Sequence, residues 1–88
     1  MNAFGADHLT AFVCSHIFSR ERPILLVSRE DGDWQFLCGG SHNPDERPRV
    51  VGIGHIVEHD PSVEQLADLG VDEEAERNSP SDPWVRRA

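Results

Sequence analysis

A short stretch near the middle of the chain contains a pattern that can hold a catalytic metal. His55-x-x-Glu58-His59 is the inverted zinc-protease pattern, in which two imidazoles bind zinc and a carboxylate activates water. Such a site needs both histidines on a stable helix and a third protein ligand. Asp60-Pro61 follows at once, and proline biases its predecessor away from helical angles. We therefore predict no metal site here, and keep a metal-dependent hydrolase that uses His55, Glu58 and His59 as the alternative.

Two cysteines and two further histidines form a second candidate metal site, which comprises Cys14, His16, Cys38 and His42. Both cysteines lie in apolar runs, which is typical of buried free thiols, and the C-x-x-C spacing that usually clamps zinc is absent. Nothing cationic or helix-capping in the nearby sequence suggests a lowered thiol pKa. We expect inert core thiols, no cofactor and no enzymatic activity.

The charge of the chain limits the classes of partner. Sixteen acidic residues stand against eight basic ones, all arginine, which gives a formal net charge of −8 over 88 residues. This charge disfavours nucleic acid and membrane surfaces, and suits a protein partner with a basic surface. The first residues lack the features of a secretory signal, so we expect a cytoplasmic protein that is a monomer or a homodimer.

A hairpin is predicted in the first half of the chain. Ile24 to Val27 is an unbroken apolar run that indicates a central strand, and Asp31-Gly32 tolerates the positive φ angles of a tight hairpin turn. A loop of those two residues places Val27 opposite Phe36 and allows Arg29 to stack on Trp34. Trp34 and Phe36 are then expected in the core.

Other segments complete an α+β domain. The alternation of Ala11 to Phe18 predicts a strand, and Val50 to Ile53 can form another. Asp60-Pro61 predicts a helix start with Asp60 as N-cap, and Gly70 its end. Trp84 and Val85 are expected to dock the chain end as an edge strand. The prediction is one domain, 1–88, with less regular segments at 1–9 and 71–88, built as a small antiparallel meander of three to five strands against one or two short helices.

Three motifs carry a resemblance to a known family: Asp33 to Gly39, Asp60-Pro61-Ser62 and Glu76-Arg77. Together they make the stretch from about Val13 to Arg77 similar to small bacterial domains grouped as the immunity protein 33 family of polymorphic toxin systems. The family pattern usually continues past its glycine with acidic residues, whereas this chain has Gly40-Ser41-His42. The resemblance implies a domain that binds a protein, such as a toxin domain, and implies no catalytic residues.

The predicted binding surface combines a long polar loop, Gly40 to Arg49, with an acidic segment after residue 71. No packing role explains the composition of either stretch, and long polar loops often carry function. The candidate binding residues are His42, Asp45, Glu46, Asp72, Glu73, Glu74 and Glu76. The sequence thus predicts a small binding module that recognises a protein partner.

Overall fold

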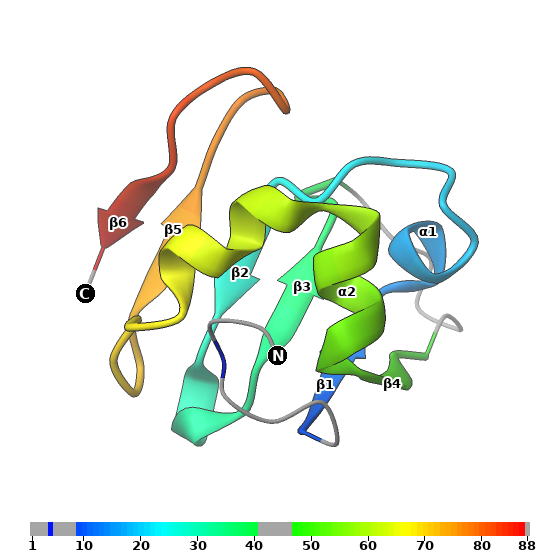
Figure 1. Cartoon of the computed structure of the whole chain (residues 1–88), viewed down its shortest axis with the longest axis horizontal. Coiled ribbons are helices and arrows are strands. Elements are labelled where there is room, and N and C mark those ends of the chain that lie inside the picture. The colour runs from blue at the N-terminus through cyan, green and yellow to red at the C-terminus, as the bar shows by residue number, and fades with distance from the viewer. Residues whose placement is uncertain (1–3, 5–8, 41–46, 88) are drawn as a thin grey trace.

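The structure, a computed structural model, describes Phe4, residues 9–40 and residues 47–87. One mixed sheet has the strand order β4-β1-β3-β2-β5-β6, and α2 with the short helix that follows it lies across one face (Figure 1). The elements are β1 (Thr10–Val13), α1 (Ser15–Phe18), β2 (Leu26–Ser28), the 3-10 helix η1 (Glu30–Gly32), β3 (Gln35–Leu37), β4 (Arg49–Gly52), α2 (Ile53–His59), the 3-10 helix η2 (Pro61–Leu66), β5 (Glu74–Glu76) and β6 (Val85–Arg87).

The α+β class is confirmed, but the sheet differs in detail from the expected meander. Within the described residues it has six strands, and β1 runs parallel to β3 while the other neighbouring pairs are antiparallel. The reason is that the chain skips one strand position between β1 and β2, and β3 then fills that position. The segment 71–88, expected to be less regular, contributes β5 and β6.

The β2–β3 hairpin has the predicted register. Val27 pairs with Phe36, and Asp31 and Gly32 at the turn have φ angles of 55° and 85°. The Arg29 guanidinium lies 4.8 Å from the centroid of the Trp34 ring, as expected for a cation–π contact. Phe36 is fully buried and Trp34 nearly so, which confirms both as core residues.

The predicted strand Ala11 to Phe18 is wrong in its second half. The strand ends at Val13, and the amide of Phe18 donates to the Cys14 carbonyl at 3.0 Å, which closes a helical turn. This turn buries Ile17 beside Val13 and leaves Phe18 exposed. Helical periodicity thus replaces the predicted alternation, which would have put Phe18 on the same face as Cys14.

The predicted cap at Asp60 is confirmed. Its carboxylate accepts a hydrogen bond from the Ser62 amide at 3.0 Å, and Pro61 opens the helix. The helix is of the 3-10 type over Pro61–Leu66, and it presents Val63 and Leu66 to the core. Val85 also lies in an edge strand, β6, as predicted.

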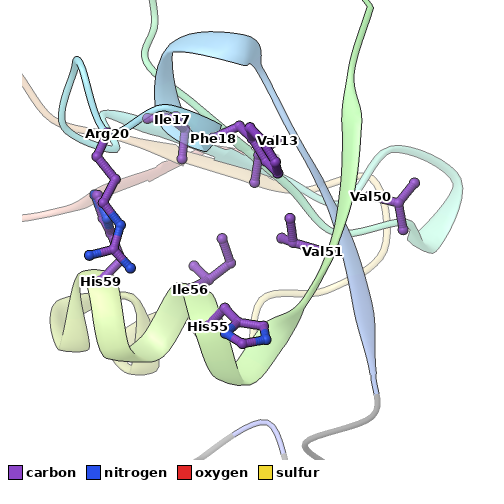
Figure 2. A pocket seen from close by; sticks show the side chains of 9 residues that line it. All are labelled: Val13, Ile17, Phe18, Arg20, Val50, Val51, His55, Ile56 and His59. Atoms are coloured by element: carbon purple, nitrogen blue, oxygen red, sulfur yellow. The ribbon is translucent and has the colours of Figure 1, made fainter.

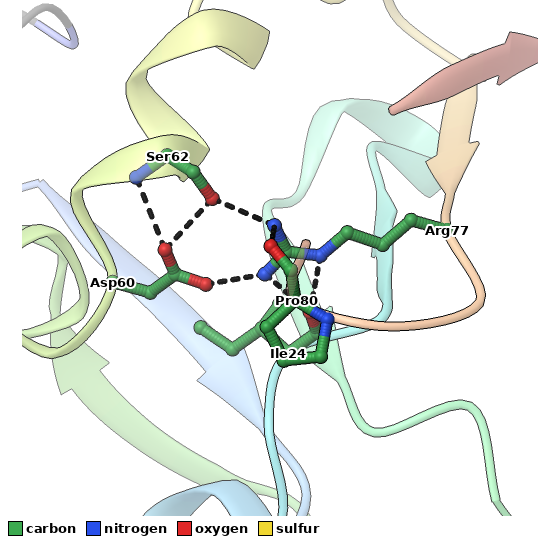
Figure 3. Close-up of polar contacts among 5 residues, drawn as sticks. All are labelled: Ile24, Asp60, Ser62, Arg77 and Pro80. Carbon is green, nitrogen blue, oxygen red and sulfur yellow. Dashed lines mark hydrogen bonds and ion pairs between the residues drawn. The ribbon is translucent and has the colours of Figure 1, made fainter. Parts of the chain in front are cut away.

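Arg77 connects the Glu76-Arg77 motif to the Asp60-Pro61-Ser62 motif through a buried polar network (Figure 3). Its guanidinium forms an ion pair with Asp60 at 2.5 Å, donates to the Ser62 hydroxyl at 3.0 Å, and donates twice to the Ile24 carbonyl at 3.1 and 3.0 Å. It also lies 4.2 Å from the centroid of the Trp84 ring. The network ties η2, the chain before β2 and the segment after β5 together, so these motif residues have a structural role.

Because of the Arg77 network, the free energy of unfolding should depend on pH in the acid range. Burial alone would raise the pKa of Asp60, but hydrogen bonds from Ser62 and the Arg77 charge hold that pKa below its ordinary value. The resulting stabilisation is complete above the unfolded-state pKa, roughly 4, and is lost as the pH falls through the lower folded-state pKa. We expect the stability gap between wild type and Asp60→Asn to shrink as the pH falls below about 4. Denaturant unfolding at a series of pH values measures this gap, and a constant gap would contradict the assignment.

Candidate functional site

A groove opens between α1, β4 and α2 (Figure 2), with a volume of about 400 Å³. Apolar side chains from β1, α1, β4 and α2 form most of its surface, and three basic side chains complete it. The lining residues are Val13, Ile17, Phe18, Arg20, Val50, Val51, His55, Ile56 and His59.

The groove exposes apolar surface that the core does not use. Phe18 and Val50 retain 52% and 60% exposure, although both are large apolar side chains. Val13, Ile17 and Ile56 beneath them are buried in the core. Apolar surface gathered around a concavity often marks a binding site, whereas scattered exposed apolar residues do not.

Basic side chains border this apolar surface. His55 and His59 lie one helical turn apart, so both project from the same face of α2. Arg20 extends from the chain after α1 toward the α2 side of the groove (Figure 2). The Arg49 guanidinium lies 5.1 Å from the centroid of the Phe18 ring. Among the residues that the structure describes, no carboxylate lines the groove.

At the opposite edge of the sheet, near β6, basic side chains are paired with carboxylates. β4 and β6 are the two edges, and the exposed ion pairs of the described residues lie near β6. Arg87 pairs there with Glu74 and Glu76 at 2.9 and 3.1 Å. No ion pair within the described ranges neutralises Arg20 or Arg49. A chain with a net charge of −8 therefore carries a basic groove at one edge.

The inverted zinc pattern is only partly assembled. α2 spans Ile53–His59 and contains both histidines, so the helix is longer than the proline suggested. Across the described ranges, however, His55, Glu58 and His59 are not gathered into a cluster that could hold a metal ion. The helix thus presents two imidazoles to the groove without a gathered third ligand.

The acidic segment has partners within its own chain. Asp72 accepts a hydrogen bond from the Asp31 amide at 2.9 Å, and Glu73 accepts one from the Gly70 amide at 2.6 Å. Glu74 and Glu76 pair with Arg87, as described above. These contacts hold a turn and an edge strand in place, so the acidic segment has a structural role that its composition did not indicate. His42, Asp45 and Glu46 lie outside the described residues.

The two cysteines are buried thiols, as expected, but their surroundings are not inert. The Cys38 sulfur lies 3.7 Å from Arg22 Nη1, 3.7 Å from His16 Nδ1 and 3.4 Å from the Gly40 amide nitrogen. The expectation that no cation adjoins either thiol is wrong, because folding brings Arg22 from a different segment. His42, the fourth residue of the predicted group, is outside the described ranges.

The two thiols differ in acidity. Burial raises the pKa of Cys14, an effect only partly offset by hydrogen bonds with backbone groups. Burial acts in the same direction on Cys38, but the Gly40 amide, the Arg22 guanidinium and the Cys14 thiol outweigh it and lower the pKa of Cys38. The hydrogen-bond donors around its sulfur therefore stabilise the thiolate form of Cys38.

Sequence reasoning missed the groove. The sequence pattern placed Phe18 in a strand, and no motif drew attention to Arg20. The sequence signal for the groove was the pair Val50 and Val51, which lies in a predicted strand and does not alternate with polar residues. In the structure this strand is an edge strand, and Val50 is exposed.

Comparisons with known proteins add no relative: no protein-family model, curated protein or solved structure matches this chain. Within the described residues, no helix has the length and apolar character needed to cross a bilayer.

Proposed function

We propose that this domain is a binding module that takes an acidic, apolar-containing segment of a partner protein in the groove between α1, β4 and α2. The observation that supports this proposal is the combination of exposed Phe18 and Val50 with a basic border, in a groove that no carboxylate of the described residues lines. Burial of the apolar surface supplies affinity, and the basic groups select the sign of the partner's charge.

The shape of the site favours a protein segment over nucleic acid or a membrane. The groove runs beside β4, an edge strand whose outer backbone can pair with an extended chain. Polyanions of high charge density are disfavoured because the chain as a whole is strongly acidic. In an immunity-like role, the partner would be a toxin domain that presents such a segment.

This proposal differs from the sequence-based prediction of a basic partner. That prediction placed the contact on the acidic segment, whose carboxylates are engaged within the chain. It remains the contrasting hypothesis, and the two are separated by the charge of the partner and by the edge of the sheet that binds it.

We expect peptides selected on the immobilised domain from a displayed random library to be enriched in Asp or Glu next to bulky apolar residues. Val50→Glu and Arg20→Glu should each weaken the affinity of a selected synthetic peptide at least about tenfold, because each adds a carboxylate where the peptide carries its own. Isothermal titration calorimetry measures these affinities, and circular dichroism checks that each variant is folded.

Val85→Glu is the matched control. Val85 lies in the opposite edge strand with 56% exposure, close to the 60% of Val50, so the same substitution there should leave the affinity unchanged. Selection of basic peptides whose binding is lost in Glu74→Lys would instead support the acidic segment and overturn the groove.

A further inference from the structure

The strand topology explains why Cys14, His16 and Cys38 lie close together. Cys14 follows β1 and Cys38 follows β3, and these strands are parallel neighbours with Val13 paired to Phe36. Parallel strands end at the same edge of a sheet, so both thiols emerge there. α1 begins directly after Cys14, and its first turn carries His16 to the same place.

The potential ligand atoms lie close to the separations that a metal imposes. The two sulfurs and a ring nitrogen of His16 all lie within 4.8 Å of one another, and His16 Nδ1 is 3.7 Å from Cys38 Sγ. Tetrahedral zinc with thiolate and imidazole ligands holds these atoms about 3.5 to 3.8 Å apart. Closing around an ion therefore requires shifts of about 1 Å or less.

We propose that Cys14, His16 and Cys38 form a Zn²⁺ site with three protein ligands and a fourth position open to water or to another ligand. Two thiolates and an imidazole form the donor set that borderline-soft Zn²⁺ prefers, whereas Mg²⁺ and Ca²⁺ require oxygen ligands. The site is independent of the binding groove, because none of its three ligands lines that groove.

The surroundings of Cys38 already favour the thiolate, the form of cysteine that binds a metal. Arg22 Nη1 and the Gly40 amide both point hydrogen toward Cys38 Sγ, which is the polarity that a bound cation also satisfies. Arg22 is exposed and held by no ion pair within the described ranges, so it can leave when a metal binds. Arg22 is therefore a competitor of the metal, and Arg22→Gln should raise the affinity for Zn²⁺.

The test is a titration of the purified full chain with Co²⁺, in the presence of a phosphine reductant that keeps both thiols reduced. Tetrahedral thiolate coordination gives sulfur-to-metal charge-transfer absorption and visible ligand-field bands, and displacement by Zn²⁺ gives the Zn²⁺ affinity. We expect one ion per chain. His16→Ala should weaken Zn²⁺ binding at least about tenfold. Removing a residue that only hydrogen-bonds a metal ligand already costs about tenfold or more, and His16 is itself a proposed ligand.

The controls use histidines and an arginine of the same chain. His16 is half-buried, so His16→Ala tests the site without opening the core, and Cys38→Ala should remove most of the charge-transfer absorption. His55→Ala with His59→Ala should leave the affinity unchanged, and Arg22→Gln should increase it. Equal affinity in wild type and His16→Ala, or loss of binding in the His55 and His59 variant, would overturn the proposal.

Discussion

Arg77→Met is expected to lower the free energy of unfolding by about 3 to 5 kcal/mol, the range for breaking a buried ion pair from one side. Methionine keeps an apolar stem of similar length, so the loss reports the guanidinium rather than a cavity. Without it, the Asp60 carboxylate and the Ile24 carbonyl lose their charged donor, and the Trp84 ring loses its cation. Urea unfolding followed by circular dichroism measures the change.

Two further variants locate the effect. Combining Arg77→Met with Asp60→Asn should cost less than the sum of the single changes, because both remove the same ion pair. Arg86→Met removes the exposed pair with Asp68 and should change stability little. Additive losses at Arg77 and Asp60 would show that the pair does not act as one unit.

Phe36→Ala is expected to cost about 3 to 5 kcal/mol, because it empties the centre of the sheet. Phe36 has no exposed surface and stacks at 6.0 Å between ring centroids on Trp34. A loss of this size approaches the whole stability of a domain this small, so the variant should melt at a much lower temperature or fail to fold.

Phe18→Ala is the matched change on the surface. The Phe18 ring is about half exposed, and its removal should cost less than about 1 kcal/mol. Thermal melts of the two variants at equal concentration compare them directly. Similar melting temperatures would mean that Phe36 is not central to the core.

Local sequence signals predicted the segments in which neighbours along the chain decide the structure. Asp31-Gly32 set the hairpin turn and the pairing of Val27 with Phe36, and Asp60-Pro61 set the start of η2. These features need only backbone preferences and apolar alternation, which are visible in a single sequence.

Long-range arrangement was not visible in the same way. The insertion of β3 between β1 and β2 depends on how the whole sheet packs, and alternation alone could not distinguish the helical turn of α1 from a longer strand. The groove and the setting of Cys38 were missed for the same reason. Arg49 reaches the Phe18 ring, and Arg22 reaches the Cys38 sulfur, only after the chain folds.

The central claim is that the groove between α1, β4 and α2 binds an acidic, apolar-containing segment. The most direct measurement is the map of backbone amide chemical-shift changes when a selected peptide is titrated into isotope-labelled protein. The claim predicts that the largest shifts fall on Phe18, Val50, His55 and their neighbours, and that they shrink as salt is added. Largest shifts on β5 and β6, with the groove residues unmoved, would contradict it.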